Sequence, residues 1–307
     1  MDTRRIDRSG FCDLHSHSTA SDGTDSPTRL AHNAARVGLR ALALTDHDTV
    51  AGLAECSVAC ATLGIEFVPG IEVSANVRAI TNPAPDARPI LHILGLFVRP
   101  DAAGLRALCD RQLSLRNEHV PRILECLGGM GMPVTLEEVA ACSGGEVLGR
   151  MHIANAMIAR GYVSSMGEAR RYLGRHGPIQ PLREFIPPAD AIAGIHAAGG
   201  LAVLAHPVRL ECPDDEDLRA AVRRLKELGL DGLETLHSEH APEDTALYTQ
   251  LAQELDLLVS GGSDYHGANK PKITLGSQMV PFDWVVPLRD GIQHRSSPAQ
   301  SRPQLQQ

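Results

Sequence analysis

Histidine and carboxylate side chains follow short apolar segments at several places in this chain. His15 and His17 open the series after an apolar segment, and Asp264 and His266 close it about 250 residues later. His15 and His17 are two residues apart, so an extended backbone would put both side chains on the same face. Histidine nitrogen and carboxylate oxygen are usual ligands of the metals that catalyse hydrolysis. This pattern predicts one folded site that holds several metal ions.

Further ligand candidates lie between these two runs. Asp22 occupies the turn-like sequence SDG, His47 follows the apolar run ALALT, and His206 follows LAVLA. Taken singly, Asp22 is typical of a turn, and His206 is typical of a core histidine with its hydrogen bonds satisfied. Glu72 stands in a segment rich in isoleucine and valine, where a lone acid is costly unless it is paired or binds a metal. Their joint placement after predicted strands favours the metal site.

The first hundred residues predict alternating strands and helices. A serine cap followed by proline at Ser26-Pro27 marks the start of one helix. The predicted elements are strands at 11–17, 41–45, 66–74 and 90–98, and helices from 26 to about 38 and at 50–63. A proline-containing loop at 76–89 precedes the last of these strands. If that strand returns antiparallel, His92 falls near Glu72.

Residues from about 101 to 187 predict helices without a convincing strand, and the alternation of strand and helix then resumes. We therefore expect an α/β fold with about seven strands. Its expected parts are a barrel formed by residues 11–100 and 188–290, an all-helical insertion at 101–187, and a disordered polar tail at 291–307. In such barrels the active site lies at the carboxyl ends of the strands, where the ligand candidates fall.

Composition limits the classes of function. The net charge of −8 argues against broad binding of nucleic acid, but it allows a site that binds one phosphate or one strand end. The sequence has no stretch of 18 apolar residues, and residues 1–10 lack the apolar core of a signal peptide. Seven cysteines without a CxxC pair indicate reduced thiols. We expect a cytoplasmic protein without an obligate protein partner.

Six motifs carry a resemblance to a known family. DLHSHSTASDG, TDHD, GIEVSA, HILG, AHP and SDYH occur in this order within residues 11–267. They resemble the motifs of the polymerase and histidinol phosphatase (PHP) family of metal-dependent phosphoesterases. The resemblance implies a distorted seven-stranded β/α barrel, TIM-like, and two or three divalent metal ions. Manganese is the first expectation, with zinc and iron as alternatives.

The same resemblance implies which residues bind each ion. One ion is expected at His15, His17, Glu72 and Asp264, a second at Glu72, His92 and His206, and a third at Asp22, His47 and His266. A water activated by the ions would then attack phosphorus. The leaving oxygen still needs a proton or stabilisation, for which His206, His237 and Asp46 are unranked candidates.

Arginines in and near the expected insertion are the candidates for substrate recognition. Arg150 opens a predicted helix, and its guanidinium could bind a phosphate bidentately with help from His152. Arg209 follows His206 by three residues and could meet a second phosphate. Arg116 and Arg175 are further candidates. The alternative for each arginine is a solvated surface charge.

The barrel, the helical insertion and the run GRMH at 149–152 resemble one PHP subgroup. That subgroup removes the 3′-phosphate from 3′,5′-nucleoside bisphosphates such as pAp, and close relatives are 5′→3′ exoribonucleases on short RNA. The resemblance implies a nucleotide substrate, or the 5′ end of a short RNA. The alternatives are histidinol-phosphate phosphatase or another small phosphomonoesterase, and a metal-binding protein without turnover.

Overall fold

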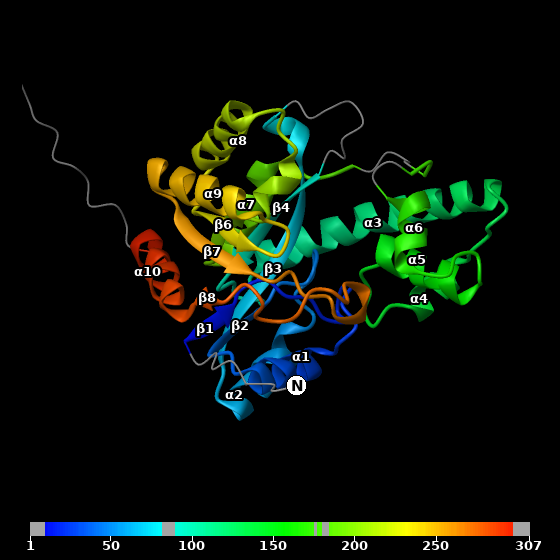
Figure 1. Cartoon of the computed structure of the whole chain (residues 1–307), viewed down its shortest axis with the longest axis horizontal. Helices are drawn as coiled ribbons and strands as arrows, with labels where there is room; N and C mark the ends of the chain where they lie inside the picture. The colour runs from blue at the N-terminus through cyan, green and yellow to red at the C-terminus, as the bar shows by residue number, and fades with distance from the viewer. Residues whose placement is uncertain (1–9, 82–89, 175–176, 180–183, 297–307) are drawn as a thin grey trace, which may run out of the picture.

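A curved mixed sheet organises the chain into a nearly closed barrel (Figure 1). The computed structural model describes residues 10–81, 90–174, 177–179 and 184–296. Within these residues eight strands form one sheet, in the order β7-β6-β5-β4-β3-β2-β1-β8. The strands are β1 (Phe11–Asp13), β2 (Ala41–Leu44), β3 (Glu66–Asn76), β4 (Ile90–Leu96), β5 (Leu201–Leu204), β6 (Gly232–His237), β7 (Leu258–Gly262) and β8 (Val280–Pro281).

Strand directions explain why the barrel is distorted. The strands β1, β2 and β3 run parallel, and so do β5, β6 and β7. Between these two groups, β4 is antiparallel to both neighbours, with His92 opposite Ser74. The barrel closes where the Leu14 amide donates to the Gly261 carbonyl at 3.1 Å, so that β1 meets β7. The predicted seven-stranded barrel is confirmed, and β8 is a short additional strand antiparallel to β1.

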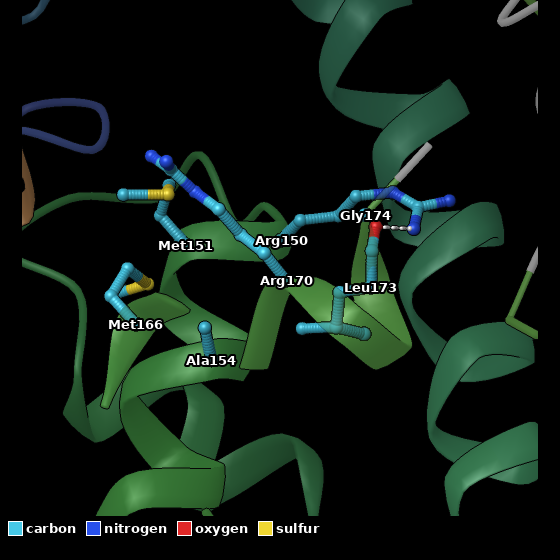
Figure 2. A pocket seen from close by; sticks show the side chains of 7 residues that line it. All are labelled: Arg150, Met151, Ala154, Met166, Arg170, Leu173 and Gly174. Atoms are coloured by element: carbon cyan, nitrogen blue, oxygen red, sulfur yellow. Dashed lines mark hydrogen bonds between the residues drawn. The ribbon is translucent and has the colours of Figure 1, made fainter. Parts of the chain in front are cut away.

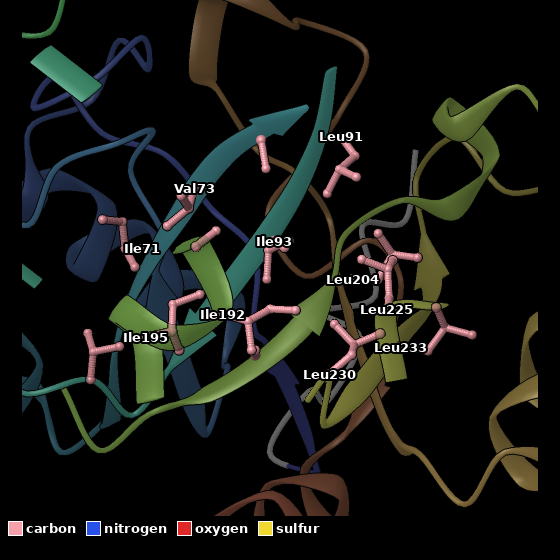
Figure 3. Packing of buried hydrophobic residues seen from close by; sticks show 14 of the residues in the cluster. Ile71, Val73, Leu91, Ile93, Ile192, Ile195, Leu204, Leu225, Leu230 and Leu233 are labelled. Atoms are coloured by element: carbon pink, nitrogen blue, oxygen red, sulfur yellow. The ribbon is translucent and has the colours of Figure 1, made fainter. Parts of the chain in front are cut away.

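Helices surround the barrel and supply its outer core. They are α1 (Pro27–Val37), α2 (Leu53–Leu63), α3 (Ala103–Gly129), α4 (Leu136–Ala141), α5 (Arg150–Ala159), α6 (Met166–Leu173), α7 (Pro188–Ala197), α8 (Asp215–Glu227), α9 (Pro242–Glu254) and α10 (Val285–Ser296). Figure 3 shows strand residues such as Ile93 and Leu233 packed against helix residues such as Ile192 and Leu225. Among the described residues, no helix is long and apolar enough to cross a membrane.

Alternation along the strands separates two apolar cores. On β2, Leu42 and Leu44 join the cluster beneath the helices, whereas Ala41 and Ala43 join a second cluster that includes residues of α10. On β3, Val68 belongs to this second cluster, and the side chain of Glu72 follows at the same parity of the strand. The interior of the barrel is therefore apolar toward the start of β3 and acidic farther along it.

The segment from α3 to α6 has an apolar cluster of its own. It includes Val120 and Ile123 of α3, Ile153 and Met157 of α5, and Leu173 of α6. Within the part of this segment that the structure describes, there is no strand. These observations support the proposed helical insertion at 101–187. The polar tail expected from 291 begins inside α10, which extends to Ser296, and residues 297–307 lie outside the described residues.

Two buried polar side chains of α3 connect the insertion to the barrel. Arg116 forms an ion pair with Asp48, with Nε 2.9 Å from Oδ2, and Asp48 lies just past the end of β2. Gln112, one helical turn earlier, donates to the Ser74 carbonyl of β3 at 2.5 Å. Asp48 also accepts the Ser74 amide at 2.7 Å. These contacts hold α3 beside the polar end of β2 and β3.

Candidate metal centre

The nine side chains predicted as ligands meet at one end of the barrel. They are supplied by the loop after β1 (His15, His17, Asp22), the segment after β2 (His47), β3 (Glu72), β4 (His92), the turn after β5 (His206) and the turn after β7 (Asp264, His266). Because β4 runs antiparallel, the start of β4 lies beside the end of β3. His92 and Glu72 are therefore neighbours as predicted, with Nδ1 2.9 Å from Oε1.

Glu72 is the centre of the site and is fully buried. Its two carboxylate oxygens face five histidine nitrogens. Oε2 lies 2.9 Å from His47 Nδ1, 3.2 Å from His17 Nε2 and 3.4 Å from His15 Nε2, while Oε1 lies 2.9 Å from His92 Nδ1 and 2.9 Å from His206 Nε2. One carboxylate placed among five imidazoles is a ligand that two metal ions can share.

Several buried atoms of this centre have no hydrogen-bond partner among the described residues. They are His15 Nε2, His17 Nε2, Asp22 Oδ1, His47 Nδ1, Glu72 Oε2 and His237 Nε2. An unpaired buried polar atom costs free energy, and a divalent cation would supply the missing partner. These residues, with others nearby, form groups whose ligand atoms all lie within 4.8 Å of one another. The donor set therefore fits divalent metal ions.

Four such groups are found among the described residues; three of them match the expected three ions in most respects, and the fourth joins His15, Glu234 and His237. The first group is His15, His17, Glu72 and Asp264, and another joins Asp22, His47 and His266 with His17. A third group joins Glu72 and His92 to His47, where the prediction has His206. His206 Nε2 lies as near to Glu72 as His47 does, at 2.9 Å, so it also suits that ion. The assignment of each ligand remains our proposal.

In the metal-free centre, carboxylates and histidine rings shift the pKa values of one another. Burial by itself would raise the pKa of Glu72, but His47, His92 and His15 outweigh it and hold that pKa well below its usual range. Burial would lower the pKa of His17, but the neighbouring carboxylates of Asp264 and Glu72 raise it to about 9. Without metal, a proton on His17 therefore compensates part of the carboxylate charge, whereas burial lowers the pKa values of His92, His206 and His266.

Metal affinity is accordingly expected to rise with pH up to about 9. Below that value the His17 ring must release a proton before it can bind a metal. Each displaced proton changes the apparent affinity by about tenfold per pH unit. The sign for stability is opposite in the metal-free protein, because a raised histidine pKa stabilises the fold below about 6.5 and loses that effect toward pH 9.

Manganese titration calorimetry at pH 6 to 9, in buffers of different ionisation enthalpy, measures this proton release. Thermal unfolding of the chelator-treated protein over the same range measures the stability effect. An affinity that does not change with pH would contradict protonation of His17 in the metal-free site.

Asp46 holds the part of the loop between two of the ligands, His17 and Asp22. It is buried, and it accepts hydrogen bonds from the Ser18 amide at 2.8 Å, the Ser18 hydroxyl at 2.6 Å and the Ser21 hydroxyl at 2.5 Å. Ser18 and Ser21 lie between His17 and Asp22 in the chain. These contacts support a positioning function for Asp46 more than the proton transfer considered from the sequence.

His237 is better placed than Asp46 to stabilise a leaving oxygen by donating a hydrogen bond. Its Nδ1 accepts the Glu239 amide at 3.1 Å, so in the neutral ring the proton lies on Nε2. Nε2 is 3.4 Å from Asp264 Oδ2 and faces the centre. His237 and Glu234 are three residues apart, and both reach the interior because the pairing of β6 with β7 shifts register between Glu234 and Leu236.

Two cations border Asp264. Lys270 Nζ lies 2.6 Å and Arg209 Nη2 lies 3.1 Å from Asp264 Oδ2. Arg209 is also held bidentately by Glu239, at 2.7 and 2.5 Å. Lys270 was not among the predicted residues, because nothing in its surface-like sequence GANK distinguishes it. The predicted Arg209 therefore lies at the metal centre, with its guanidinium already paired.

The guanidinium of Arg150 contacts the end of α6. Figure 2 shows its guanidinium at the Leu173 carbonyl, to which Nη1 donates at 2.5 Å, and Nη1 also lies 3.3 Å from the Ile179 carbonyl. Arg150 lines an open pocket with Met151, Arg170 and neighbouring residues of α5 and α6. The predicted phosphate contact of Arg150 remains a proposal.

His152 lies in the first turn of α5, two residues after Arg150. It is buried, and its Nδ1 accepts the Gly149 amide at 3.1 Å. Burial lowers the pKa of His152, while Asp22 and the Ser21 backbone raise it in part, which places the ring beside the Asp22 loop. Among the two further arginines considered, Arg116 forms the ion pair with Asp48, and Arg175 lies outside the described residues.

Comparison with known proteins agrees with this centre. A model of the family described as PHP domain matches residues 13–125. The chain is 36% identical over 277 residues to a 5′-3′ exoribonuclease of Haemophilus influenzae, covering 90% of this chain and 97% of that relative. It is 33% identical over 263 residues to a 3′,5′-nucleoside bisphosphate phosphatase of Chromobacterium violaceum, covering 83% and 86%.

A further relative and a solved structure complete the comparison. A phosphoribosyl 1,2-cyclic phosphate 1,2-diphosphodiesterase of Eggerthella lenta is 36% identical over 258 residues, covering 83% of this chain and 94% of the relative. A crystal structure from Bifidobacterium adolescentis, assigned as a metal-dependent phosphoesterase, superposes with a TM-score of 0.77 at 28% identity, covering 91% of this chain and 96% of that one.

Barrel and centre together define a metal-dependent hydrolase of phosphoric esters. The chain belongs to the PHP family, as its identity to relatives over most of their length shows.

Proposed function

We propose that this enzyme removes the 3′-phosphate from 3′,5′-nucleoside bisphosphates such as pAp and trims 5′-phosphorylated short RNA from its 5′ end. The proposal is supported by similarity to an exoribonuclease and to a nucleoside bisphosphate phosphatase, each over more than four fifths of this chain. Both substrates present a nucleoside with a 5′-phosphate and a phosphoryl group on its 3′ oxygen. One site can therefore serve both reactions.

The observation that carries the hydrolytic part is the placement of Glu72 among five histidine nitrogens. We propose two or three divalent ions here, with manganese as the first expectation and zinc or iron as alternatives. When bound, such ions lower the pKa of water and offset charge on the phosphoryl group. His15, His17, Glu72 and Asp264 would hold one ion, Glu72, His92 and His206 a second, and Asp22, His47 and His266 a third.

Residues around the ligands provide the other parts of the reaction. Lys270 and Arg209 border Asp264 and place positive charge where phosphoryl oxygens would lie. His237 presents Nε2–H toward the same carboxylate, and we propose that this N–H stabilises the leaving 3′ oxygen by donating a hydrogen bond to it. His206 was the other histidine considered for this step, but its Nε2 faces Glu72.

Substrate binding is proposed to involve the insertion. His152 lies at the edge of the centre, and the arginine-lined pocket of Arg150 and Arg170 is on the same helix pair. The acidic chain, with a net charge of −8, suits a small nucleotide or an RNA held only by its 5′ end. We also propose a cytoplasmic location and no obligate protein partner.

A substrate comparison tests the proposal. Purified enzyme with added manganese is assayed with pAp, 5′-phosphorylated short RNA, histidinol phosphate and a ribose 1,2-cyclic phosphate. We expect the highest kcat/KM with pAp or the RNA. Preference for the cyclic phosphate would move the enzyme to the activity of the Eggerthella lenta relative, and preference for histidinol phosphate would favour the alternative considered from the sequence.

Arg150→Ala tests recognition of the 5′-phosphate. If the guanidinium binds this phosphate, KM should rise by about 10- to 100-fold for pAp, the range of a charged hydrogen bond, and much less for a 3′-phosphate substrate without a 5′-phosphate. Arg111→Ala is the control, because Arg111 is exposed and pairs with Asp190 on the surface. An equal change for both substrates would show that Arg150 only holds the end of α6.

A further inference from the structure

Glu234 is a buried carboxylate that the ligand assignment does not use. It lies in β6 and is fully buried. Its Oε1 is 2.9 Å from His15 Nδ1, and its Oε2 accepts the backbone amide of His206 at 2.7 Å. Burial of a carboxylate is costly, so these two hydrogen bonds must offset the cost. One side chain thus contacts a proposed ligand of each of two metal sites.

The first contact fixes the ring of His15. A carboxylate at Nδ1 favours the proton on that nitrogen and leaves the lone pair on Nε2. His15 Nε2 faces the centre, 3.4 Å from Glu72 Oε2 and 3.6 Å from Asp264 Oδ1. Without Glu234, the ring could rotate or carry its proton on Nε2, and either change removes the lone pair from the site.

The second contact fixes the backbone of His206. This residue has φ 29° and ψ 68°, in the left-handed region that costs free energy for a residue with a side chain. The hydrogen bond from its amide to Glu234 stabilises this conformation. In it, His206 Nε2 lies 2.9 Å from Glu72 Oε1 and 3.2 Å from His92 Nδ1. Release of the amide would let the ring move away from these partners.

We propose that Glu234 is a positioning residue that organises two metal sites together, the one containing His15 and the one containing His206. This inference rests on the proposed ligand assignment. No contact of Glu234 with Asp22, His47 or His266 is found among the described residues, so the third site should not depend on it. Loss of Glu234 should therefore weaken the binding of two ions and leave the binding of the third unchanged.

Glu234→Gln tests this directly, because glutamine keeps the size and has one acceptor oxygen for two donors. Manganese binding is measured by electron paramagnetic resonance and by titration calorimetry. We expect affinity for two of the ions to fall by about 10- to 100-fold, as for other residues that orient metal ligands, and the third to keep its affinity. Wild-type affinity at all sites in the variant would overturn the proposal.

Asp231→Asn is the matched control. Asp231 also accepts from a histidine ring, His196 Nε2 at 2.9 Å, and from a backbone amide, that of Ala202 at 2.8 Å. It directly precedes β6, whereas the metal centre lies past the other end of the strand. Its substitution should change thermal stability without changing manganese affinity. An equal loss of manganese in both variants would mean that a general effect on the fold is being measured.

Two further measurements separate positioning from a structural role and from failure of the ligand assignment. In the zinc-loaded wild type, the ¹⁵N resonances of the His15 ring should show a protonated Nδ1 and a metal-bound Nε2, which requires no variant; the reverse pattern would overturn the proposal. In a double-mutant cycle, Glu234→Gln should cost less affinity in a His15→Ala background than alone, and full additivity would contradict action through His15. If His15→Ala itself leaves metal binding unchanged, the ligand assignment fails instead.

Discussion

Glu72→Gln is expected to remove two metal ions from the enzyme and to reduce phosphate release below detection. The carboxylate lies within 3.4 Å of five histidine nitrogens, and no other described side chain has this position. Glutamine has the same shape, but its amide is neutral and offers one acceptor where the carboxylate offers two. The two proposed sites that share Glu72 therefore lose their common negative ligand, while the site of Asp22, His47 and His266 keeps all three of its own.

Metal content after dialysis against a fixed manganese concentration measures this effect. Asp22→Asn should remove one ion, so the two variants should differ by a whole ion per chain. Glu66→Gln is the control, since Glu66 begins the same strand and pairs with Arg289 instead of a histidine. Equal metal loss from Glu72→Gln and Asp22→Asn would refute the sharing of Glu72 between two ions.

The sequence predicts most of the barrel because its strands are short apolar runs between clear helix signals. Apolar runs such as Ala41–Leu44 and Leu201–Leu204 are buried on both faces, which makes them easy to recognise. The strand β8 is only two residues long and contains proline, so no periodicity can reveal it. The predicted first strand at 11–17 is longer than β1, which ends at Asp13, because the chain turns into the loop that carries His15 and His17.

The site is only partly visible in the sequence. Residues such as Glu72 and Asp264 belong to short motifs in or next to strands. The order of the strands in the barrel is enough to bring such residues together. Glu234 had the same signal as Glu72, a lone acid in an apolar strand, but its partners His15 and His206 follow β1 and β5 and are brought to it only by the barrel. Lys270 could not be found, because its contact with Asp264 depends on the path of a loop.

The helical insertion shows most clearly what the sequence alone does not predict. Arginines are frequent on helix surfaces, and the sequence does not tell which of them turns toward the barrel. In the structure Arg116 is the arginine of α3 that is buried against Asp48, while Arg150 donates to carbonyls at the end of α6. The metal ligands therefore predict the type of reaction in detail, whereas the arginines predict the choice of substrate only in outline.

Asp264→Asn is expected to lower phosphate release by more than about 10³-fold while the protein remains folded, because it removes both a proposed metal ligand and a counter-ion. Oδ1 lies 3.3 Å from His17 Nε2, and Oδ2 lies near Lys270 and Arg209. Asparagine is the preferred replacement, since Asp264 has φ 57° and asparagine tolerates that conformation better than alanine. The His17→Ala variant should have the same effect on activity, because it removes a ligand of the same proposed ion.

Phosphate release from pAp at saturating manganese, together with thermal unfolding, measures these two effects separately. His32→Ala and Asp101→Ala are matched controls, because both residues are exposed. The metal-free Asp264→Asn protein should also be less stable at neutral pH, because Lys270 and Arg209 lose a buried counter-charge. Burial by itself would raise the pKa of Asp264, but Lys270, His266 and His15 outweigh burial and hold that pKa well below its usual range. The charged form of Asp264 therefore stabilises the fold at neutral pH, and asparagine removes this effect. Full activity of the purified, metal-saturated variant would refute Asp264 as a ligand, because no neighbouring carboxylate among the described residues could replace it at both His17 and Lys270.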